Sequence, residues 1–345
     1  MIRRILIKAL ALFVVFNLLF VLVAPLNGLG RISLYNTVFP GRPRLPWGEN
    51  PSAYNLSLNN LDAMFAAHEI DVGSKPADEF RVVLIGDSST WGFLLRPEET
   101  LSGQLNVMGL KAKDGRRVRV FNVGYPDFSL TKDMLIMKQA MKYQPDLVVW
   151  LVTLRSFLGG TQMHPLVRAN EPSGLSADSF FWSQRRALAD LVRLQLYGVL
   201  WSATGIDQVY PDNYERWQND LDADDSFQTL KPQTFKPDDL ALDILAGGKQ
   251  IAGNTPLMIV NEPMAIATGK NSDIRYNFFY PRWAYDRYRD LMAQQASTKQ
   301  WRYLDLWNAI PSAEFTNSAV HLTPAGSRLL AVLLREEVTK SSPAD

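Results

Sequence analysis

From residue 81 onward, short runs of consecutive apolar residues alternate with stretches in which apolar residues recur every three or four positions. An unbroken short apolar run is typical of a strand buried on both faces, and the longer spacing is typical of a helix packed on one side. The predicted strands cover residues 81–85, 117–123, 146–152, 256–260 and 302–306. The predicted helices cover residues 100–108, 131–143, 281–296 and 324–339. The alternation predicts an α/β fold, with a mainly parallel sheet of about five strands between two layers of helices.

The first quarter of the chain follows a different pattern. Residues 25–54 mix glycine, proline and asparagine with large apolar side chains. A flexible stalk would lack those apolar groups, so we predict an irregular segment that packs on the domain. Residues 56–70 have helical spacing and are also predicted to pack on the core. We therefore divide the chain into residues 1–25, residues 26–78 and a main domain at residues 79–340.

Residues 5–24 are almost wholly apolar and follow Arg3 and Arg4. A stretch of about 20 apolar residues is long enough to span a bilayer. The arginines predict that the N-terminus stays inside and that residues 79–340 lie outside the cytoplasm. The residues before Pro25 make a poor cleavage site, which favours an uncleaved signal anchor over a cleaved signal peptide. We expect a single-pass protein of the cytoplasmic membrane; a cleaved signal peptide and a helix buried in the domain are the alternatives.

About 100 residues separate the third and fourth predicted strands, which is too long for a simple crossover. We predict an inserted lid or cap at about residues 157–255, with helices at residues 182–201 and near residues 237–247. The apolar side chains of the first of these helices either pack inside the protein or contact a membrane or a partner.

Composition excludes several classes of function. The 36 basic and 35 acidic residues leave a net charge of +1, so no basic field attracts nucleic acid. The absence of cysteine excludes disulfide scaffolds, thiolate metal sites and cysteine nucleophiles. The three histidines are isolated, and no phosphate-binding glycine loop follows a strand. We expect no metal, no other cofactor and no nucleic-acid partner.

Two short motifs, far apart in the sequence, carry candidate chemistry. Gly86-Asp87-Ser88 follows the first strand, which puts a serine at the sheet edge where α/β proteins build their sites. His321 lies just before the last helix, which begins with Thr323 as its cap and Pro324 at its first position. A serine and a histidine held close together are the minimum parts of an acyl-transfer site. The alternative is that Ser88 caps a helix and His321 only packs.

These motifs resemble those of the SGNH (GDSL-type) hydrolase superfamily. The resemblance lies in Gly86-Asp87-Ser88, Asn122-Val123-Gly124 and His321-Leu322-Thr323-Pro324-Ala325-Gly326. It implies a flavodoxin-like three-layer sandwich, with Ser88 as the nucleophile and His321 as the base. It also implies an oxyanion hole formed by the backbone N–H groups of Ser88 and Gly124 and by an asparagine that follows the third strand.

The chain departs from the family pattern at the catalytic acid. The family has an aspartate three residues before the histidine, where this chain has Ser318, preceded by Asn317. We count Asn317, with Glu262 and Asp305, among the possible acid or substrate-binding residues. Three outcomes are open. A backbone carbonyl orients His321, or the carboxylate of Glu262 or Asp305 reaches the ring, or the site is impaired.

A second departure follows the third strand, where Arg155 takes the place of the asparagine. An arginine can stabilise an oxyanion or bind an anionic group of the substrate; a surface residue without a role is the alternative. The polar loop after the fourth strand lies at the same edge of the sheet, and we predict that Asn271 and Tyr276 contact the substrate. The alternative is a structural loop held by local hydrogen bonds.

A membrane-anchored domain with these motifs resembles accessory acyltransferases that modify cell-surface glycans beside membrane-bound O-acyltransferases. The resemblance implies ester hydrolysis or O-acyl transfer through an acyl-enzyme on Ser88. It implies an acyl ester or a cell-envelope glycan as substrate and a membrane-bound O-acyltransferase as partner. Two alternatives are a plain esterase or lipase, and a catalytically inactive SGNH-like scaffold or glycan-binding subunit of an envelope assembly.

Overall fold

The computed structural model describes residues 2–23, 47, 61–71, 73–170, 192, 196, 199–200 and 213–340. Its centre is a sheet of five strands, namely β1 (Glu79–Ile85), β2 (Arg117–Asn122), β3 (Leu147–Val152), β4 (Leu257–Asn261) and β5 (Arg302–Asp305). The strands lie in the order β2-β1-β3-β4-β5, and every neighbouring pair is parallel. The predicted parallel sheet is confirmed, and each strand begins and ends within two residues of its predicted bounds.

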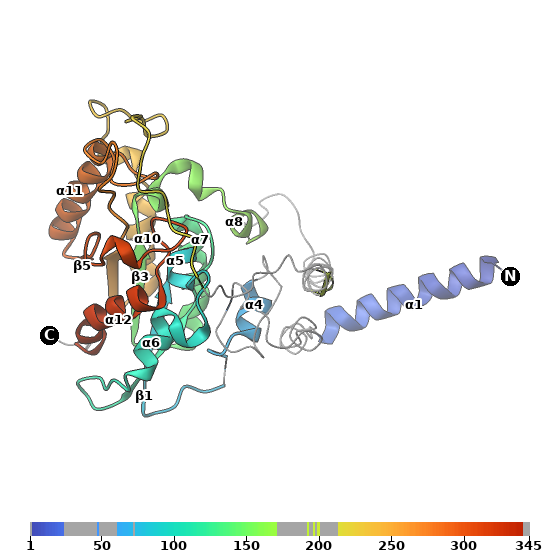
Figure 1. Cartoon of the computed structure of the whole chain (residues 1–345). Coiled ribbons are helices and arrows are strands. Elements are labelled where there is room, and N and C mark those ends of the chain that lie inside the picture. Colours follow the sequence, from blue (N-terminus) through green and yellow to red (C-terminus); the bar gives the residue numbers. More distant parts are fainter. Residues whose placement is uncertain are drawn as a thin grey trace.

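Helices cover both faces of this sheet, which explains why its central strand is apolar throughout. All six residues of β3 are buried, and alternate side chains belong to the hydrophobic cores on opposite faces. One face is covered by α7 (Leu130–Ala140), α10 (Leu242–Ala252) and α11 (Arg282–Lys299). The other is covered by α6 (Leu101–Val107) and α12 (Pro324–Thr339) (Figure 1). The three-layer α/β sandwich follows from this arrangement.

The last helix has the predicted bounds because its start signals are local. The Thr323 side chain accepts a hydrogen bond from the Gly326 N–H at 3.0 Å, and Pro324 is the first helical residue. The other helices differ from prediction at their ends. α7 changes into the 3₁₀ helix η3 (Met141–Tyr143), and α11 continues until Gln300 adopts a left-handed conformation with φ 51°.

The segment before the sheet is described only in part. α4 (Leu61–Ala67) occupies the middle of the predicted helix at residues 56–70, and it packs with Met64 and Phe65 against the core. Within residues 25–54 the structure describes Trp47 alone, which is fully buried and donates a hydrogen bond from Nε1 to the Met64 carbonyl at 2.5 Å.

The insertion between β3 and β4 is shorter than its predicted bounds. α10 includes part of the second predicted helix, but it packs on the sheet beside α7. A side chain at Gly248 would lie 2.3 Å from the Trp150 ring, so the contact with β3 is close. α10 is therefore the crossover helix of the sandwich and no part of a lid. The predicted helix at residues 182–201 lies almost wholly outside the described residues; α8 (Pro165–Asn170), which was not predicted, precedes it.

The part of the insertion that leads back towards α10 runs over the carboxyl edge of the sheet. The Trp217 N–H donates to the Thr316 carbonyl at 2.7 Å, and Arg216 donates to the carbonyls of Ala313 and Phe315 at 2.8 Å. The Leu221 N–H donates to the Lys270 carbonyl at 3.0 Å. This segment therefore holds the loops that follow β4 and β5.

At the N-terminus, α1 (Ile2–Val23) stands apart from the sandwich (Figure 1). Many of its large apolar side chains are exposed, among them Leu10 (64%) and Leu22 (78%). In the part of the chain that the structure describes, no helix meets the length and hydropathy expected of a membrane span. The predicted span at residues 5–24 is therefore not confirmed.

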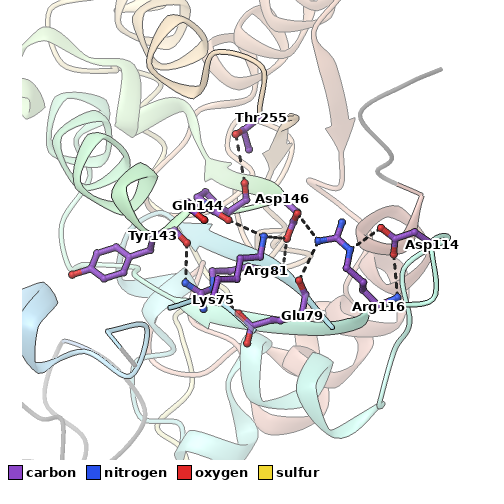
Figure 2. Close-up of polar contacts among 10 residues, drawn as sticks. Lys75, Glu79, Arg81, Asp114, Arg116, Tyr143, Gln144, Asp146 and Thr255 are labelled. Atoms are coloured by element: carbon purple, nitrogen blue, oxygen red, sulfur yellow. Dashed lines mark hydrogen bonds and ion pairs between the residues drawn. The ribbon is translucent and has the colours of Figure 1, made fainter. Parts of the chain in front are cut away.

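The amino-terminal edge of the sheet is held by ion pairs (Figure 2). The Arg81 guanidinium lies 2.5 Å from Glu79, and both side chains are almost completely buried. Asp146 pairs with Arg116 at 2.8 Å, pairs with Lys75 and accepts the Arg81 N–H at 2.6 Å. These contacts join the beginnings of β1, β2 and β3, and each carboxylate at this edge has a cation beside it.

Candidate active site

The first site residue lies on a tight turn between β1 and the short helix α5 (Ser88–Trp91). Only glycine fits at position 86, because a Cβ there would lie 2.2 Å from Thr90 Oγ1. Asp87 caps α5 by accepting a hydrogen bond from the Ser89 N–H at 2.8 Å. The turn therefore presents Ser88 at the carboxyl end of a buried strand.

His321 reaches this serine from the other end of the sequence. Its Nε2 lies 2.9 Å from the Ser88 Oγ, although 233 positions separate the two residues. The backbone carbonyl of His321 accepts the Thr316 N–H at 2.8 Å, and the ring packs against Phe93 at 4.8 Å between centroids. The structure thus brings together the serine and the histidine that the two motifs predict.

The other two histidines are engaged elsewhere. His68 Nε2 lies 2.8 Å from the Asn122 carbonyl, and its Nδ1 accepts the Ile70 N–H at 3.0 Å. His164 Nδ1 accepts the Leu166 N–H at 3.0 Å. His321 is therefore the histidine positioned to act on Ser88.

The protonation of His321 suits a base. Burial lowers the pKa of the ring to about 4, because taking the imidazolium out of water disfavours the charged form. The ring is consequently neutral at pH 7, with a nitrogen free to accept a proton from the Ser88 hydroxyl.

The group behind the histidine is an amide. Asn317 Oδ1 lies 3.1 Å from His321 Nδ1, and the Thr316 hydroxyl donates to the same oxygen at 3.2 Å. A carbonyl oxygen can only accept, so Nδ1 carries the hydrogen and Nε2 is left to accept from Ser88. None of the three outcomes left open by the sequence had a side-chain amide orienting the ring, although Asn317 was among the candidate residues. It lies four residues before His321, one position earlier than the aspartate of the family pattern.

Neither of the two carboxylates considered for this role contacts His321. Asp305 binds the Arg289 guanidinium at 2.8 and 2.9 Å and accepts from Asn261 Nδ2 at 2.8 Å. Glu262 follows β4 and is 1% exposed. Its carboxyl group lies beside the Ser89 side chain and the carboxyl group of Asp87.

Glu262 instead forms an electrostatic pair with Asp87. Burial raises the pKa of Glu262 well above its usual value, and the neighbouring Asp87 raises it further. Burial also raises the pKa of Asp87 to about 6, against the opposing effect of Lys132. Two adjacent buried carboxyl groups cannot both ionise without a large cost, so the pair holds a proton to higher pH than a free carboxyl group does, with the larger rise in pKa on Glu262. This pair under the serine turn was not predicted from the sequence.

The oxyanion donors are only partly available. The Ser88 N–H lies in the first turn of α5, where helix N–H groups have no acceptor within the helix. The Gly124 N–H donates to the Asn122 side chain at 3.0 Å, which engages the second predicted donor. Glycine is needed at position 124 for packing, since a Cβ would lie 2.6 Å from the Trp91 nitrogen.

Arg155 lies on the 3₁₀ helix η4 (Leu154–Phe157), directly after β3. Its guanidinium carbon lies 4.9 Å from the centre of the Phe128 ring and 4.8 Å from that of Phe279. Its backbone N–H donates to the Tyr280 hydroxyl at 3.4 Å. The arginine is thus held at the same edge of the sheet as Ser88.

The two candidate substrate contacts in the loop after β4, Asn271 and Tyr276, each form a hydrogen bond within the fold. Asn271 donates from Nδ2 to the Leu221 carbonyl at 2.6 Å, which ties the loop to the insertion. The Tyr276 hydroxyl donates to Asp286 on α11 at 2.7 Å, and burial raises its pKa to about 12. These contacts fit the alternative of a structural loop.

A polar cavity of about 190 Å³ lies between this loop and the insertion. Its lining includes Asp220, Asp222, Asp224, Arg275 and the ring of Phe278. The Arg275 guanidinium is bonded to backbone carbonyls, including that of Asp224 at 2.5 Å. Three carboxylates against one guanidinium make this cavity acidic, in contrast to the surroundings of Arg155.

No family model matches the chain, and no curated protein matches its sequence. Solved structures with a similar arrangement include the lipase/acylhydrolase from Enterococcus faecalis, at 17% identity and a TM-score of 0.41 over 75% of this chain and 95% of that one. A carbohydrate acetylesterase from Sinorhizobium meliloti shows 14% identity and a TM-score of 0.38 over 75% and 97% of the two chains. The aryl esterase from M. smegmatis shows 17% identity and a TM-score of 0.37 over 75% and 97%. These are resemblances to other proteins; the chemistry of the site rests on its own geometry.

Proposed function

We propose that the chain is a serine ester hydrolase or O-acyltransferase of SGNH type that works through an acyl-enzyme on Ser88. The observation that carries the proposal is the hydrogen-bonded series Ser88–His321–Asn317, with distances of 2.9 and 3.1 Å. A neutral histidine with one nitrogen facing a serine hydroxyl and the other facing an acceptor is the arrangement that activates a serine nucleophile.

The proposed reaction begins when Ser88 Oγ attacks the ester carbonyl and His321 Nε2 takes its proton. The tetrahedral intermediate carries a negative oxygen, which the Ser88 N–H at the start of α5 is placed to stabilise. His321 then gives the proton to the departing alcohol, and the acyl group stays on Ser88. Water or an acceptor hydroxyl, deprotonated by His321, removes the acyl group in the second half of the cycle.

The amide of Asn317 has a defined consequence for the rate. It fixes the tautomer and the orientation of His321, but a neutral amide stabilises the developing imidazolium less than a carboxylate does. We therefore propose a working but slower site than one with an aspartate.

The proposal extends to a cell-envelope glycan as substrate and to membrane attachment through residues 5–24. The exposed apolar side chains along α1 support attachment, because water disfavours such a surface. Attachment with the sandwich outside the cytoplasm gives Ser88 access to envelope polymers, and a membrane-bound O-acyltransferase is then the proposed source of acyl groups. Protease added to spheroplasts should digest the sandwich; full protection would contradict this topology.

A second candidate is a catalytically inactive SGNH-like binding protein. Two observations favour it, namely the amide in place of the acid and the engagement of the Gly124 N–H by Asn122. The two candidates differ in whether Ser88 is nucleophilic, which can be measured without knowing the natural substrate.

The test is covalent labelling by a fluorophosphonate together with hydrolysis of 4-nitrophenyl acetate by the full-length chain. We expect one label on Ser88 and a loss on the order of 10³-fold or more in turnover for Ser88→Ala. Ser89→Ala is the matched control, because Ser89 lies on the same turn, its backbone N–H donates to Asp87 and its side chain contacts Glu262 and not His321. A folded wild-type protein with neither label nor turnover would favour the binding protein.

A further inference from the structure

Arg155 is held in an aromatic corner formed by Phe128 and Phe279. The two ring centroids are 5.9 Å apart and the ring planes meet at 82°, so the rings form two walls. The guanidinium carbon lies within 5 Å of each ring centre, at 4.9 and 4.8 Å. Stacking of this kind fixes a guanidinium in place while leaving its N–H groups free to bind something else.

Within the described ranges, those N–H groups have no partner. Among the described residues, no carboxylate lies within ion-pair distance of Arg155, and no acceptor takes a hydrogen bond from its side chain. Its side chain is only partly buried, so an incoming group can reach it. A guanidinium that is oriented in advance and lacks a counter-charge is a binding site for a carboxylate or another anion.

The topology places this arginine beside Ser88. Phe128 follows β2, Arg155 follows β3, and β1 lies between those two strands in the sheet. Contact between Phe128 and Arg155 therefore crosses the carboxyl end of β1, which is where Ser88 lies. The strand register agrees with this placement. Ile85, three residues before Ser88, is paired with Trp150, five residues before Arg155. A molecule whose ester group meets Ser88 would consequently have Arg155 within reach of its other atoms.

The backbone of Arg155 is also fixed. Its N–H donates to the Tyr280 hydroxyl at 3.4 Å, and that hydroxyl lies 3.0 Å from Thr153 Oγ1. Phe279 and Tyr280 are adjacent residues of the loop after β4, so one loop positions both the main chain and the side chain of the arginine. The cavity that Phe278 lines is acidic and therefore disfavours an anion. Of the two, the guanidinium of Arg155 is the more favourable site for an anion.

We propose that Arg155 binds a carboxylate of the substrate, so that the preferred substrates of Ser88 are esters carrying a negative charge. This inference rests on the proposed function, and it names the substrate class. The carboxylate belongs either to the acyl group, as in a half-ester of a dicarboxylic acid, or to the alcohol part, as in an acylated acidic sugar. Arg155 is then a specificity residue that attracts the substrate and aligns it on the serine.

The test compares charged esters with uncharged partners of the same shape. Monophenyl succinate and its methyl ester place the charge in the acyl group; 3-acetoxybenzoate and its methyl ester place it in the alcohol part. We expect the wild-type chain to have the higher kcat/KM for the charged member of one pair, and that pair identifies the source of the carboxylate.

Arg155→Gln should remove this preference. Hydrogen bonds to charged groups account for about a 10- to 100-fold loss of kcat/KM on the charged ester, with little change on the neutral one. Arg155→Lys should keep part of the preference, and added salt should weaken it in the wild type. Arg328→Gln, an exposed arginine on α12, is the matched control and should leave the preference unchanged.

An equal loss on charged and neutral esters would overturn the inference, because it would make Arg155 a general oxyanion donor. No loss on either ester would overturn it as well. If Ser88 proves inert, calorimetry still tests the anion site. It compares the binding of 3-acetoxybenzoate and monophenyl succinate to Ser88→Ala and to the double variant Ser88→Ala with Arg155→Gln. Weaker binding without Arg155 supports the anion site even though the proposed catalysis fails, and equal binding rejects the site.

Discussion

The two edges of the sheet differ in whether their charged and titratable side chains have partners of opposite charge. At the amino-terminal edge each buried or half-buried carboxylate has a cation beside it: Glu79 pairs with Arg81, and Asp146 pairs with Lys75 and Arg116 (Figure 2). These pairs join the beginnings of three strands. Their role is structural, since no group is left over to act on another molecule.

At the carboxyl-terminal edge Asp305 is paired with Arg289, but the titratable groups around Ser88 lack such partners. Glu262 lies against another carboxyl group, Asp87, and Arg155 lies against two aromatic rings. His321 faces the neutral amide of Asn317. Titratable groups that the fold leaves without an opposite charge are costly to keep, and they cluster at functional sites. The comparison teaches that ion pairs stabilise one edge of the sheet, while the other edge keeps polar and titratable groups available for a substrate.

The largest effect on stability should come from breaking the amino-terminal edge. Arg81→Ala leaves the buried Glu79 with only the more distant and exposed Arg119 beside it, which should lower the free energy of unfolding by about 3–5 kcal/mol. Urea unfolding measures the loss. Arg119→Ala is the control, because its side chain is 38% exposed and lies 3.7 Å from the same carboxylate; it should cost less than about 1 kcal/mol. Equal losses in the two variants would contradict the structural role of the Arg81 pair.

A smaller effect is expected from supplying the missing charge behind the base. In Asn317→Asp a carboxylate should face His321 Nδ1, which favours the imidazolium and should raise the pKa of the ring from about 4 by about one unit or more. Turnover well above that pKa should rise by about tenfold, since one pKa unit corresponds to ~1.4 kcal/mol.

Ser318→Asp is the control for this prediction. Position 318 is where the family has its aspartate, but Asn317 faces the ring here. A carboxylate at position 318 should therefore leave the pKa of His321 unchanged. An increase in turnover from Ser318→Asp alone, with none from Asn317→Asp, would contradict the observed arrangement.

The last effect, on the pH dependence of stability, concerns the carboxyl pair under the serine turn. The pKa of Glu262 is higher in the folded than in the unfolded chain, so its stabilising contribution is complete below its unfolded pKa and declines as pH rises. His321 and His164 have lowered pKa values of about 4, so their contributions increase with pH up to about 6.5 and are constant above it. Above pH 7 the two histidines therefore add no pH dependence to the free energy of unfolding, so a dependence that comes from the carboxyl pair can be measured by itself.

Glu262→Gln should flatten the pH dependence of stability in that range. The wild type should lose up to ~1.4 kcal/mol per pH unit as Glu262 ionises, and the amide cannot ionise. Urea unfolding at pH 7, 8 and 9 compares the two proteins. Parallel slopes would show that Glu262 is already ionised at pH 7.

The parts of the fold that could be predicted from sequence are those that local signals determine. Buried strands such as residues 146–152 are continuous apolar runs, and Thr323 with Pro324 marks the start of α12. The pairing of Ser88 with His321 follows, because both residues come after strands of one parallel sheet. These inferences need only the periodicity and the ends of the elements.

The remaining features depend on contacts between distant segments. Asn317 faces His321 because Phe315 pairs with Leu322 and the Thr316 N–H bonds the His321 carbonyl, which folds the loop back on itself. α10 was assigned to the insertion because its helical pattern does not indicate which surface it packs on. The approach of Glu262 to Asp87 and the aromatic corner around Arg155 join loops from different strands, and no local pattern indicates either contact.

The central claim is that a neutral His321, oriented by Asn317, activates Ser88. The most direct test is the rate at which a fluorophosphonate modifies Ser88, measured from pH 3 to pH 10 on the full-length chain. We predict a rate that rises with an apparent pKa of about 4, stays constant through neutral pH, and falls on the order of 10³-fold in His321→Ala. A rate that rises only at high pH, or equal rates in the wild type and His321→Ala, would contradict the claim.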